Sequence, residues 1–284
     1  MDWVPLFFID AVYHQLTRVA FQEVRQLWGG WSIIGAEHHG KRREFVFYCS
    51  VDGKESRYYI EETRIPIRLL AAELNLEFDR ITSVKFESNS KNHWGNQVLL
   101  NELSRDVLPT VSSLATNCTW YYLNSAFSSQ NRIFFEAFKN CPGFNYIIVQ
   151  EQGQESRDFL VRQVELGNVQ TLHLYAGEPE KLGGTFQTFV NSSRFHQLIS
   201  DGSLPNDIEL FELFLERALA GELKPGAYLQ IYNISLDKIK SLHPECRKHS
   251  TEIAWRIPNS NRRVALEECD RSFCLEVMSA ASAN

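Results

Sequence analysis

The sequence predicts an α/β protein in which a small helical module precedes a larger domain of alternating strands and helices. Three features lead to this fold class. Apolar residues recur at helical spacing over the first forty positions, residues 44–60 alternate apolar and polar side chains, and strand-like runs then recur about every 26 residues. We therefore expect two domains, a three-helix module over 1–43 and a β/α domain over 44–284.

The N-terminal module opens with a predicted helix over residues 5–17. Phe8, Val12 and Leu16 lie four residues apart, so their side chains share one face of that helix. The proline at its start suits the first helical turn, because the N–H groups there have no partner within the helix. Two further apolar sets between residues 19 and 36 predict two more short helices.

A β-hairpin is predicted next, over residues 44–60. Two runs of alternating apolar and polar residues flank Asp52-Gly53, a dipeptide that favours the tight turn of a two-residue hairpin loop. The change from helical to alternating spacing places the domain boundary at about residue 43.

Seven short strand-like runs occupy the rest of the chain, with amphipathic helical segments between them. Their central apolar residues are Val84, Tyr121, Ile147, Leu172, Leu198, Leu229 and Trp255. Most of the intervals are about 26 residues, and strands joined by helices pair in parallel. This period is typical of a leucine-rich-repeat solenoid, here an irregular one because the usual terminal asparagine is present only at Asn89. A single α/β layer domain is the alternative.

The composition disfavours several classes of protein. The net charge of -6 and the pI of about 5.8 disfavour nucleic-acid binding. The sequence has no run of 18 apolar residues, and its opening apolar run is interrupted by Asp10 and lacks the basic leader of a secretory signal. The six cysteines include no C-x-x-C pair and predict reduced thiols. We expect a cytoplasmic or nuclear protein that binds neither nucleic acid nor membrane.

The sequence carries no G-x-S-x-G elbow, P-loop, dinucleotide fingerprint or H-E-x-x-H motif. His38 and His39 beside Glu37 suggest metal ligands at first sight. Adjacent helical residues point about 100° apart, however, so the pair predicts a solvated helix end. We therefore expect no catalytic residue, no metal site, no cofactor and no enzymatic activity.

Aromatic and histidine side chains on the strands predict a face that binds a target protein. Because alternate strand residues point to the same side, Tyr122 and His173 are expected to point outward. Tyr175 and Tyr232, which lie in or next to strands, complete this candidate target-binding set. Packing against a neighbouring helix is the alternative for these residues.

The first forty residues resemble an F-box. The resemblance depends on the start Val4-Pro5, on three short apolar helices, and on Trp31, whose distance from the proline fits the F-box pattern without a gap. The opening is similar to that of divergent F-box-like proteins expanded in nematodes. Phe7, Ala20 and Trp28 depart from the F-box pattern, where an acidic residue, an aspartate and a cysteine are common.

This resemblance implies a substrate-recognition subunit of an SCF-type ubiquitin ligase, with no catalytic activity of its own. The N-terminal helices would bind a Skp-type adaptor of a cullin complex, and the repeats would bind a target protein for ubiquitin conjugation. The residues implied in adaptor binding are Val4, Pro5, Leu6, Phe7, Phe8, Ile9, Val12, Leu16, Phe21, Val24, Leu27 and Trp31.

The residues alone are also compatible with two other functions. One is a repeat-based interaction scaffold whose N-terminal helices cap the solenoid, and the other is an α/β enzyme. The side chain of Phe7 distinguishes docking from capping, because it lies near the polar stripe of Asp10 and His14. An exposed Phe7 predicts a binding surface, and a buried Phe7 predicts a cap.

Overall fold

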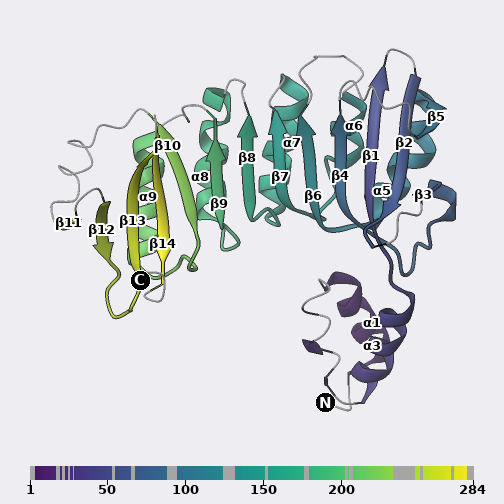
Figure 1. Ribbon diagram of the computed structural model, residues 1–284, viewed down its shortest axis with the longest axis horizontal. Helices are drawn as coiled ribbons and strands as arrows, with labels where there is room; N and C mark the ends of the chain where they lie inside the picture. The colour runs from purple at the N-terminus through teal and green to yellow at the C-terminus, as the bar shows by residue number, and fades with distance from the viewer. Residues whose placement is uncertain are drawn as a thin grey trace. The chain divides into compact units, whose positions relative to one another are not determined.

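The computed structural model of the chain is shown in Figure 1. The residues that it describes are 4–16, 20, 23–24, 26–27, 29–52, 55–64, 68–87, 95–123, 132–150, 153–175, 179–201, 204, 207–232, 247–249, 252–269 and 272–279. They form two compact units, Met1–Asn145 and Tyr146–Asn284. The predicted domain boundary at residue 43 falls inside the first unit, between a helix and a strand, and stays a prediction.

The first unit begins with two helices, α1 (Leu6–Gln15) and α3 (Gly30–Lys41), which pack against each other. Their shared core is formed by the buried side chains of Ile9 and Tyr13, against which Leu16 and other apolar residues pack. The buried stripe of α1 is therefore rotated from the predicted one, and Phe8 is exposed. In the region predicted as a second helix, residues 19, 21, 22 and 25 lie outside the described part.

Among the described residues of the first unit, six strands form the sheet. They are β1 (Glu44–Asp52), β2 (Glu55–Glu62), β3 (Arg68–Leu69), β4 (Arg80–Glu87), β5 (Asn96–Leu99) and β6 (Ala115–Leu123). The strand order is β6-β4-β1-β2, and β3 and β5 both pair with the far edge of β2. β1 pairs with β4 and β4 with β6 in parallel, whereas β1 and β2 form the predicted antiparallel hairpin.

Short helices and an aromatic core support this sheet. The helical segments are the 3-10 turn η1 (Ala71–Glu73), α4 (Leu100–Glu102), the π-helical turn η2 (Leu103–Val107), α5 (Leu108–Leu114) and α6 (Arg132–Phe138). Trp120 is fully buried, with its ring centroid 4.8 Å from that of Phe86 and 5.2 Å from that of Phe138. Rings from β4, β6 and α6 therefore form one layer, which fixes α6 on the sheet.

The second unit alternates strands and helices and then continues as strands alone. Its elements are β7 (Phe144–Gln150), α7 (Gln154–Leu166), β8 (Thr171–Tyr175), the 3-10 turn η4 (Pro179–Leu182), α8 (Gly183–Asn191), β9 (Gln197–Ser200), α9 (Asp207–Leu219), β10 (Tyr228–Tyr232), β11 (Arg247–His249), β12 (Glu252–Arg256), β13 (Arg263–Cys269) and β14 (Ser272–Met278). β7, β8, β9 and β10 pair in parallel. From β10 the order continues β14-β13-β12-β11, and these pairs are antiparallel.

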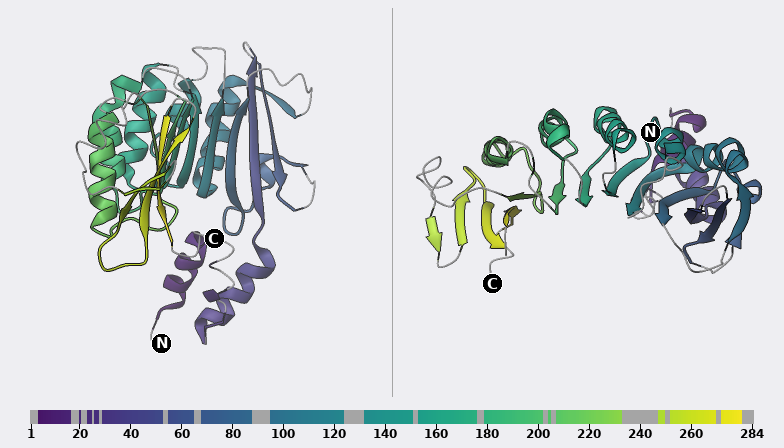
Figure 2. Two further views of the ribbon diagram at one scale, coloured as in Figure 1. Left: turned by 60° about the vertical axis from the view of Figure 1, so that its left-hand side comes forward. Right: turned by 90° about the horizontal axis from the view of Figure 1, so that it is seen from above.

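The helices of the second unit lie on one face of its sheet. Figure 2 shows α7, α8 and α9 along the same side of the parallel strands. The side chains that face the helices are buried, as Leu172 and Leu174 are in β8, and those between them are partly exposed. The parallel strands therefore have one covered face and one face that no described helix covers.

The predicted fold class is wrong. A three-helix module and a β/α solenoid were expected, and the structure instead has large mixed sheets with antiparallel strands in both units. The recurring interval of about 26 residues reflects β/α alternation, which any parallel stretch of an α/β sheet produces. Trp255 fits that interval but lies in the antiparallel strand β12, because only a short turn joins β12 to β13.

Candidate functional site

The close packing of α1 on α3 depends on two glycines of α3. A Cβ atom added to Gly30 would lie 2.8 Å from Cδ2 of Leu6, and one added to Gly35 would lie 2.5 Å from the hydroxyl oxygen of Tyr13. Tyr13 donates a hydrogen bond to the carbonyl oxygen of Trp31 at 2.7 Å. The absence of side chains at these glycines thus lets the backbone of α3 approach α1, and the tyrosine hydroxyl is satisfied inside the contact.

Three consecutive large apolar side chains at the start of α1 point into solvent. The exposed fractions are 57% for Leu6, 77% for Phe7 and 51% for Phe8, and these three residues are named the apolar tip below. Phe7 lies about 160° around the helix from the buried Ile9, and hence almost opposite it. Ile33 of α3 is also exposed. The first turn of α1 therefore presents apolar surface that the described residues of the chain leave uncovered.

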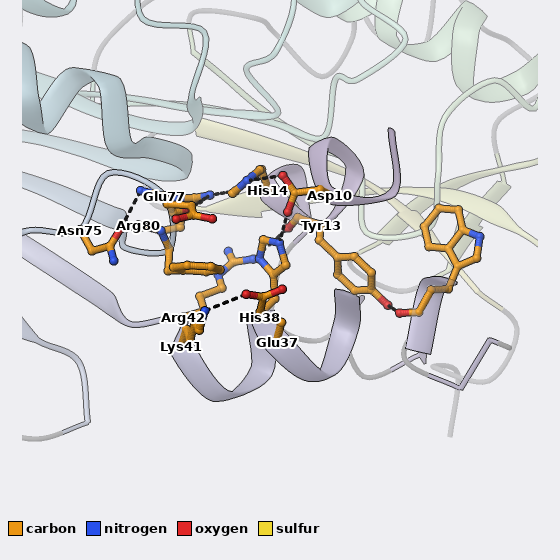
Figure 3. A network of polar contacts seen from close by, with 12 residues as sticks. Asp10, Tyr13, His14, Glu37, His38, Lys41, Arg42, Asn75, Glu77 and Arg80 are labelled. Carbon is orange, nitrogen blue, oxygen red and sulfur yellow. Dashed lines mark hydrogen bonds and ion pairs between the residues drawn. The ribbon is translucent and has the colours of Figure 1, made fainter. Parts of the chain in front are cut away.

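Beside the apolar tip, Asp10 joins the two helices through a polar network (Figure 3). Its Oδ1 atom lies 2.7 Å from Nε2 of His38, and its Oδ2 atom lies 3.1 Å from Nε2 of His14. The guanidinium of Arg80, the first residue of β4, contacts Nδ1 of His14. Asp10, His14, His38 and Arg80 are named the Asp10 network below.

The loop before β4 packs against the Asp10 network. Arg80 donates to the carbonyl oxygen of Glu77 at 2.9 Å, and Phe78 meets the ring of His38 edge-on with centroids 5.5 Å apart. Burial lowers the pKa of the Arg80 guanidinium, and the Asp10 carboxylate acts in the opposite direction. At the C-terminal end of α1, Asn117 donates to the carbonyl oxygen of Gln15 at 2.7 Å. These contacts fix the helix pair on the sheet of the first unit.

A second ion pair stabilises the same loop. The Asp79 carboxylate is fully buried and accepts two hydrogen bonds from Arg43, at 2.9 and 2.7 Å. It also accepts from the backbone N–H of Asn75 at 2.7 Å. The paired carboxylate raises the pKa of the Arg43 guanidinium, chiefly through the hydrogen bonds. This bidentate pair holds the chain segment that leaves α3 against the turn that precedes β4.

The residues expected to bind an adaptor separate into surface and core. Pro5, Leu6, Phe7, Phe8 and Leu27 are exposed, Ile9 is buried, and Val4, Val12, Leu16, Val24 and Trp31 are partly buried. Phe21 lies outside the described residues. The exposed members at the start of α1 can contact another molecule directly, whereas Ile9 supports the helix pair from inside.

The residues expected to bind a target also separate. Tyr122 is fully buried, so the expectation that it points outward is wrong. The alternation in β6 has the opposite phase, and the partly exposed neighbour is Tyr121. His173, Tyr175 and Tyr232 are partly exposed and alternate with the buried residues that face the helices, so they lie on the opposite face of the second unit's sheet.

His173 and Tyr175 form a small cluster on that uncovered face. Their ring centroids are 4.3 Å apart, and Nε2 of His173 lies 3.9 Å from Oδ1 of Asp201. Burial lowers the pKa of His173, and the nearby Asp201 carboxylate offsets part of this shift. The cluster offers an aromatic face and an imidazole, which suit contact with a protein side chain.

The prediction that both paired histidines lie at a solvated helix end is wrong for one of them. His39 is exposed, as expected for a solvated helix end, but His38 is only 1% exposed and bonds to Asp10. The local signal was the Asp10 and His14 pair, four residues apart on one helix. The partners His38 and Arg80 could not be found from spacing, because they lie on other elements far along the chain from Asp10.

Comparisons with known proteins give few relatives. No family model matches the chain, and no curated protein matches it significantly. Among solved structures, it is similar to the MycE methyltransferase of the mycinamycin biosynthetic pathway in complex with Mg, SAH and mycinamycin VI, with 12% identity, a TM-score of 0.26, and coverage of 98% of this chain and 93% of that chain. A crystal form of the same enzyme with Mg and SAH gives 10% identity, a TM-score of 0.28, and coverage of 99% and 94%.

These findings correct the expected function. Nothing in them indicates an F-box or a leucine-rich repeat, and the similar structures are those of a methyltransferase. The expected role in an SCF-type ubiquitin ligase, with its scaffold alternative, depended on a leucine-rich-repeat solenoid that the described residues do not form, and it is therefore wrong. The expectation that the chain is not an enzyme finds no support in these comparisons. At these TM-scores no reaction or ligand of MycE is carried over to this chain. The Skp-type adaptor and cullin complex stay predictions as partners.

One further expectation concerns membranes. Among the helices that the structure describes, none is long and apolar enough to cross a bilayer.

Proposed function

We propose that the N-terminal helices dock this chain onto a partner protein, and that the apolar tip is the contact surface. The 77% exposure of the Phe7 side chain is the observation that carries this proposal. Burying a phenylalanine side chain is favourable by roughly 1.5 to 3 kcal/mol. Transfer of three large apolar side chains from water to a protein interface would therefore favour binding. A partner that covers Leu6, Phe7 and Phe8 together gains that free energy.

The chemistry of α1 favours a protein over a lipid surface. None of the ten residues of α1 is lysine or arginine, and its charged side chain near the tip is Asp10. Helices that lie on membranes usually carry basic residues on their polar face, where they attract anionic headgroups. An apolar pocket of a protein with neutral or basic groups at its rim fits both the tip and the adjacent carboxylate.

The packing of the helix pair prepares the tip for binding. Ile9 and Tyr13 anchor α1 on α3, and the Asp10 network fixes α1 from its polar side. A contact surface that is already ordered loses less conformational entropy on binding than a flexible segment does. The proposed compartment is the cytoplasm or nucleus, and the reduced thiols at Cys49, Cys118 and Cys141 support it.

The test compares two leucines of matched exposure in the full chain. Leu6 in the apolar tip is 57% exposed and Leu99 at the end of β5 is 56% exposed. A photo-crosslinking amino acid at Phe7 identifies candidate partners in cell extract, and each is then purified and titrated by calorimetry. We expect Leu6→Ser and Phe7→Ser each to weaken binding about tenfold or more, and Leu99→Ser to leave it unchanged.

Other occupants of the apolar tip would overturn the proposal. A concentration-dependent dimer in analytical ultracentrifugation that Phe7→Ser abolishes would assign the tip to a second copy of this chain. Co-sedimentation with neutral phosphatidylcholine vesicles that Phe7→Ser abolishes would assign it to a membrane. Equal binding of a purified partner by Leu6→Ser, Leu99→Ser and the unchanged protein would place the contact elsewhere.

A further inference from the structure

Three potential metal ligands converge beside the apolar tip. One ligand atom each from Asp10, His14 and His38 lies within 4.8 Å of the others. Asp10 and His14 lie four residues apart on α1, and His38 approaches the same carboxylate from α3. We propose that these three side chains bind one divalent transition-metal ion, with zinc as the expected ion. This proposal is independent of the docking function.

The donor set and its spacing suit zinc. Two imidazole nitrogens and one carboxylate are typical ligands of Zn²⁺, whereas Mg²⁺ and Ca²⁺ prefer oxygen ligands alone. Zinc–ligand bonds of about 2.0 to 2.2 Å place two tetrahedral ligands roughly 3.3 Å apart. Asp10 Oδ1 lies 2.7 Å from Nε2 of His38 and Asp10 Oδ2 lies 3.1 Å from Nε2 of His14, so the carboxylate must move from each imidazole by a few tenths of an ångström. One ligand atom from each residue lies within 4.8 Å of the others, so small side-chain rotations bring all three to the spacing of a tetrahedral site.

The surrounding side chains hold His38 in position. Its ring stacks on Tyr13 with centroids 5.4 Å apart and an interplanar angle of 21°, and Phe78 packs against it edge-on. The ring of His14 meets it at 4.8 Å. Since packed neighbours fix the imidazole plane, Nε2 of His38 is directed at the ion position before any ion binds.

The other two ligands leave the site open to solvent. The side chains of Asp10 and His14 are 42% and 24% exposed, while His38 lies beneath them. An ion can therefore enter from the side of Asp10. Three protein ligands would leave a fourth tetrahedral position for water, an arrangement found in open zinc sites.

Arg80 competes with the ion for this site. A guanidinium group only donates, so its contact with Nδ1 of His14 requires the proton of a neutral His14 ring to lie on Nε2, facing Asp10. When a metal takes Nε2, that proton moves through water to Nδ1, which then repels Arg80. Arg80 already donates to the carbonyl oxygens of Glu77 and Asp79, and it keeps these acceptors when it leaves His14.

This competition predicts opposite effects for two substitutions. His14→Gln removes a ligand at a partly exposed position, and we expect it to weaken metal binding about a hundredfold. Arg80→Gln removes the competing positive charge, and we expect it to tighten binding about tenfold. His39→Gln is the matched control, because His39 is the exposed neighbour of His38 and is not part of the site.

The experiment titrates the purified full chain, stripped with a chelator, with Co²⁺ and then with Zn²⁺. We expect one equivalent of Co²⁺ to give the visible absorption of a tetrahedral site, Zn²⁺ to displace it, and a Kd for Zn²⁺ of about 10 µM or tighter. Circular dichroism checks the fold of each variant, and Asp10→Asn replaces His14→Gln if the latter unfolds. Absence of saturable one-to-one binding, or equal loss of binding in His39→Gln and His14→Gln, would show that the three residues form only a hydrogen-bonded network.

Discussion

Gly35 lies directly against the ring of Tyr13, and a Cβ atom at this glycine would be 2.5 Å from the tyrosine hydroxyl and 2.9 Å from Cζ. The tyrosine is fully buried and its hydroxyl is bonded to the carbonyl oxygen of Trp31, so the ring has little room to retreat. The two helices can therefore pack at this distance only because Gly35 has no side chain.

Gly35→Ala is therefore expected to destabilise the helix pair by about 1 to 3 kcal/mol, despite the better helix propensity of alanine. Gly40→Ala on the same helix is the control, since a Cβ there meets no atom within 4 Å. We expect the control to stabilise α3 by up to about 1 kcal/mol. Amide hydrogen exchange over residues 6–15 and 30–41 measures both effects, and faster exchange in Gly40→Ala than in Gly35→Ala would contradict this packing.

The exposed and buried members of α1 should differ sharply in their effect on stability. Truncating Ile9, which is buried against α3, is expected to cost about 2 to 4 kcal/mol because it leaves a cavity. Truncating Phe7 in the apolar tip is expected to change the free energy of unfolding by less than about 0.5 kcal/mol. Urea unfolding of Ile9→Ala and Phe7→Ala measures the difference. A large loss of stability in Phe7→Ala would mean that the tip packs within this chain.

Three buried cysteines should react slowly in the native protein. Burial raises the pKa of the Cys49, Cys118 and Cys141 thiols, and the nearby Cys141 raises that of Cys118 further. Because the thiolate is the reactive form, we expect labelling by a disulfide reagent near pH 8 to be about 100-fold slower than for a small thiol. Peptide mapping after labelling, with and without denaturant, measures each site. Rapid native labelling of Cys118 would show that the β6 region opens readily.

The sequence was informative about local structure. The hairpin around Asp52-Gly53 is present as β1 and β2, and the amphipathic helical segment predicted between the strand-like runs of Leu198 and Leu229 is α9. In these segments the periodicity of apolar residues decides the element, because burial of one face dominates local stability. The prediction for Tyr122 was wrong for a different reason. In a run of four large apolar or aromatic residues, alternation alone does not say which residue faces the core.

Pairing between distant segments could not be deduced in the same way. Whether a strand adds in parallel or antiparallel depends on where its neighbours in the sequence begin and end, and the strand-like runs did not separate β13 from β14, which lie two residues apart in the sequence and pair antiparallel. The site beside α1 was missed because Asp10 meets His38, and His14 meets Arg80, only after α3 and β4 are in place. A pattern within one helix cannot contain that information.

Asp207, the first residue of α9, gives a pH-dependent prediction. Burial raises its pKa to about 6, while hydrogen bonds with the backbone at Tyr232 and Leu204 act in the opposite direction. An aspartate in an unfolded chain has a pKa of about 3.9, so the folded state binds this proton more tightly. Ionised Asp207 therefore costs up to roughly 3 kcal/mol above pH 6, a cost that disappears as the pH falls from about 6 to about 4.

Asp207→Asn should remove this cost while keeping the size of the side chain. We expect the variant to be more stable than the unchanged protein by about 1 to 3 kcal/mol near pH 7.5, and to lose most of that advantage near pH 4. Glu216→Gln, at an exposed position of the same helix, is the control for the loss of one negative charge. Urea unfolding at both pH values measures the differences. If Asp207→Asn gains the same stability at both pH values, the gain comes from packing or net charge. Only a buried carboxylate with a raised pKa makes the gain in stability depend on pH.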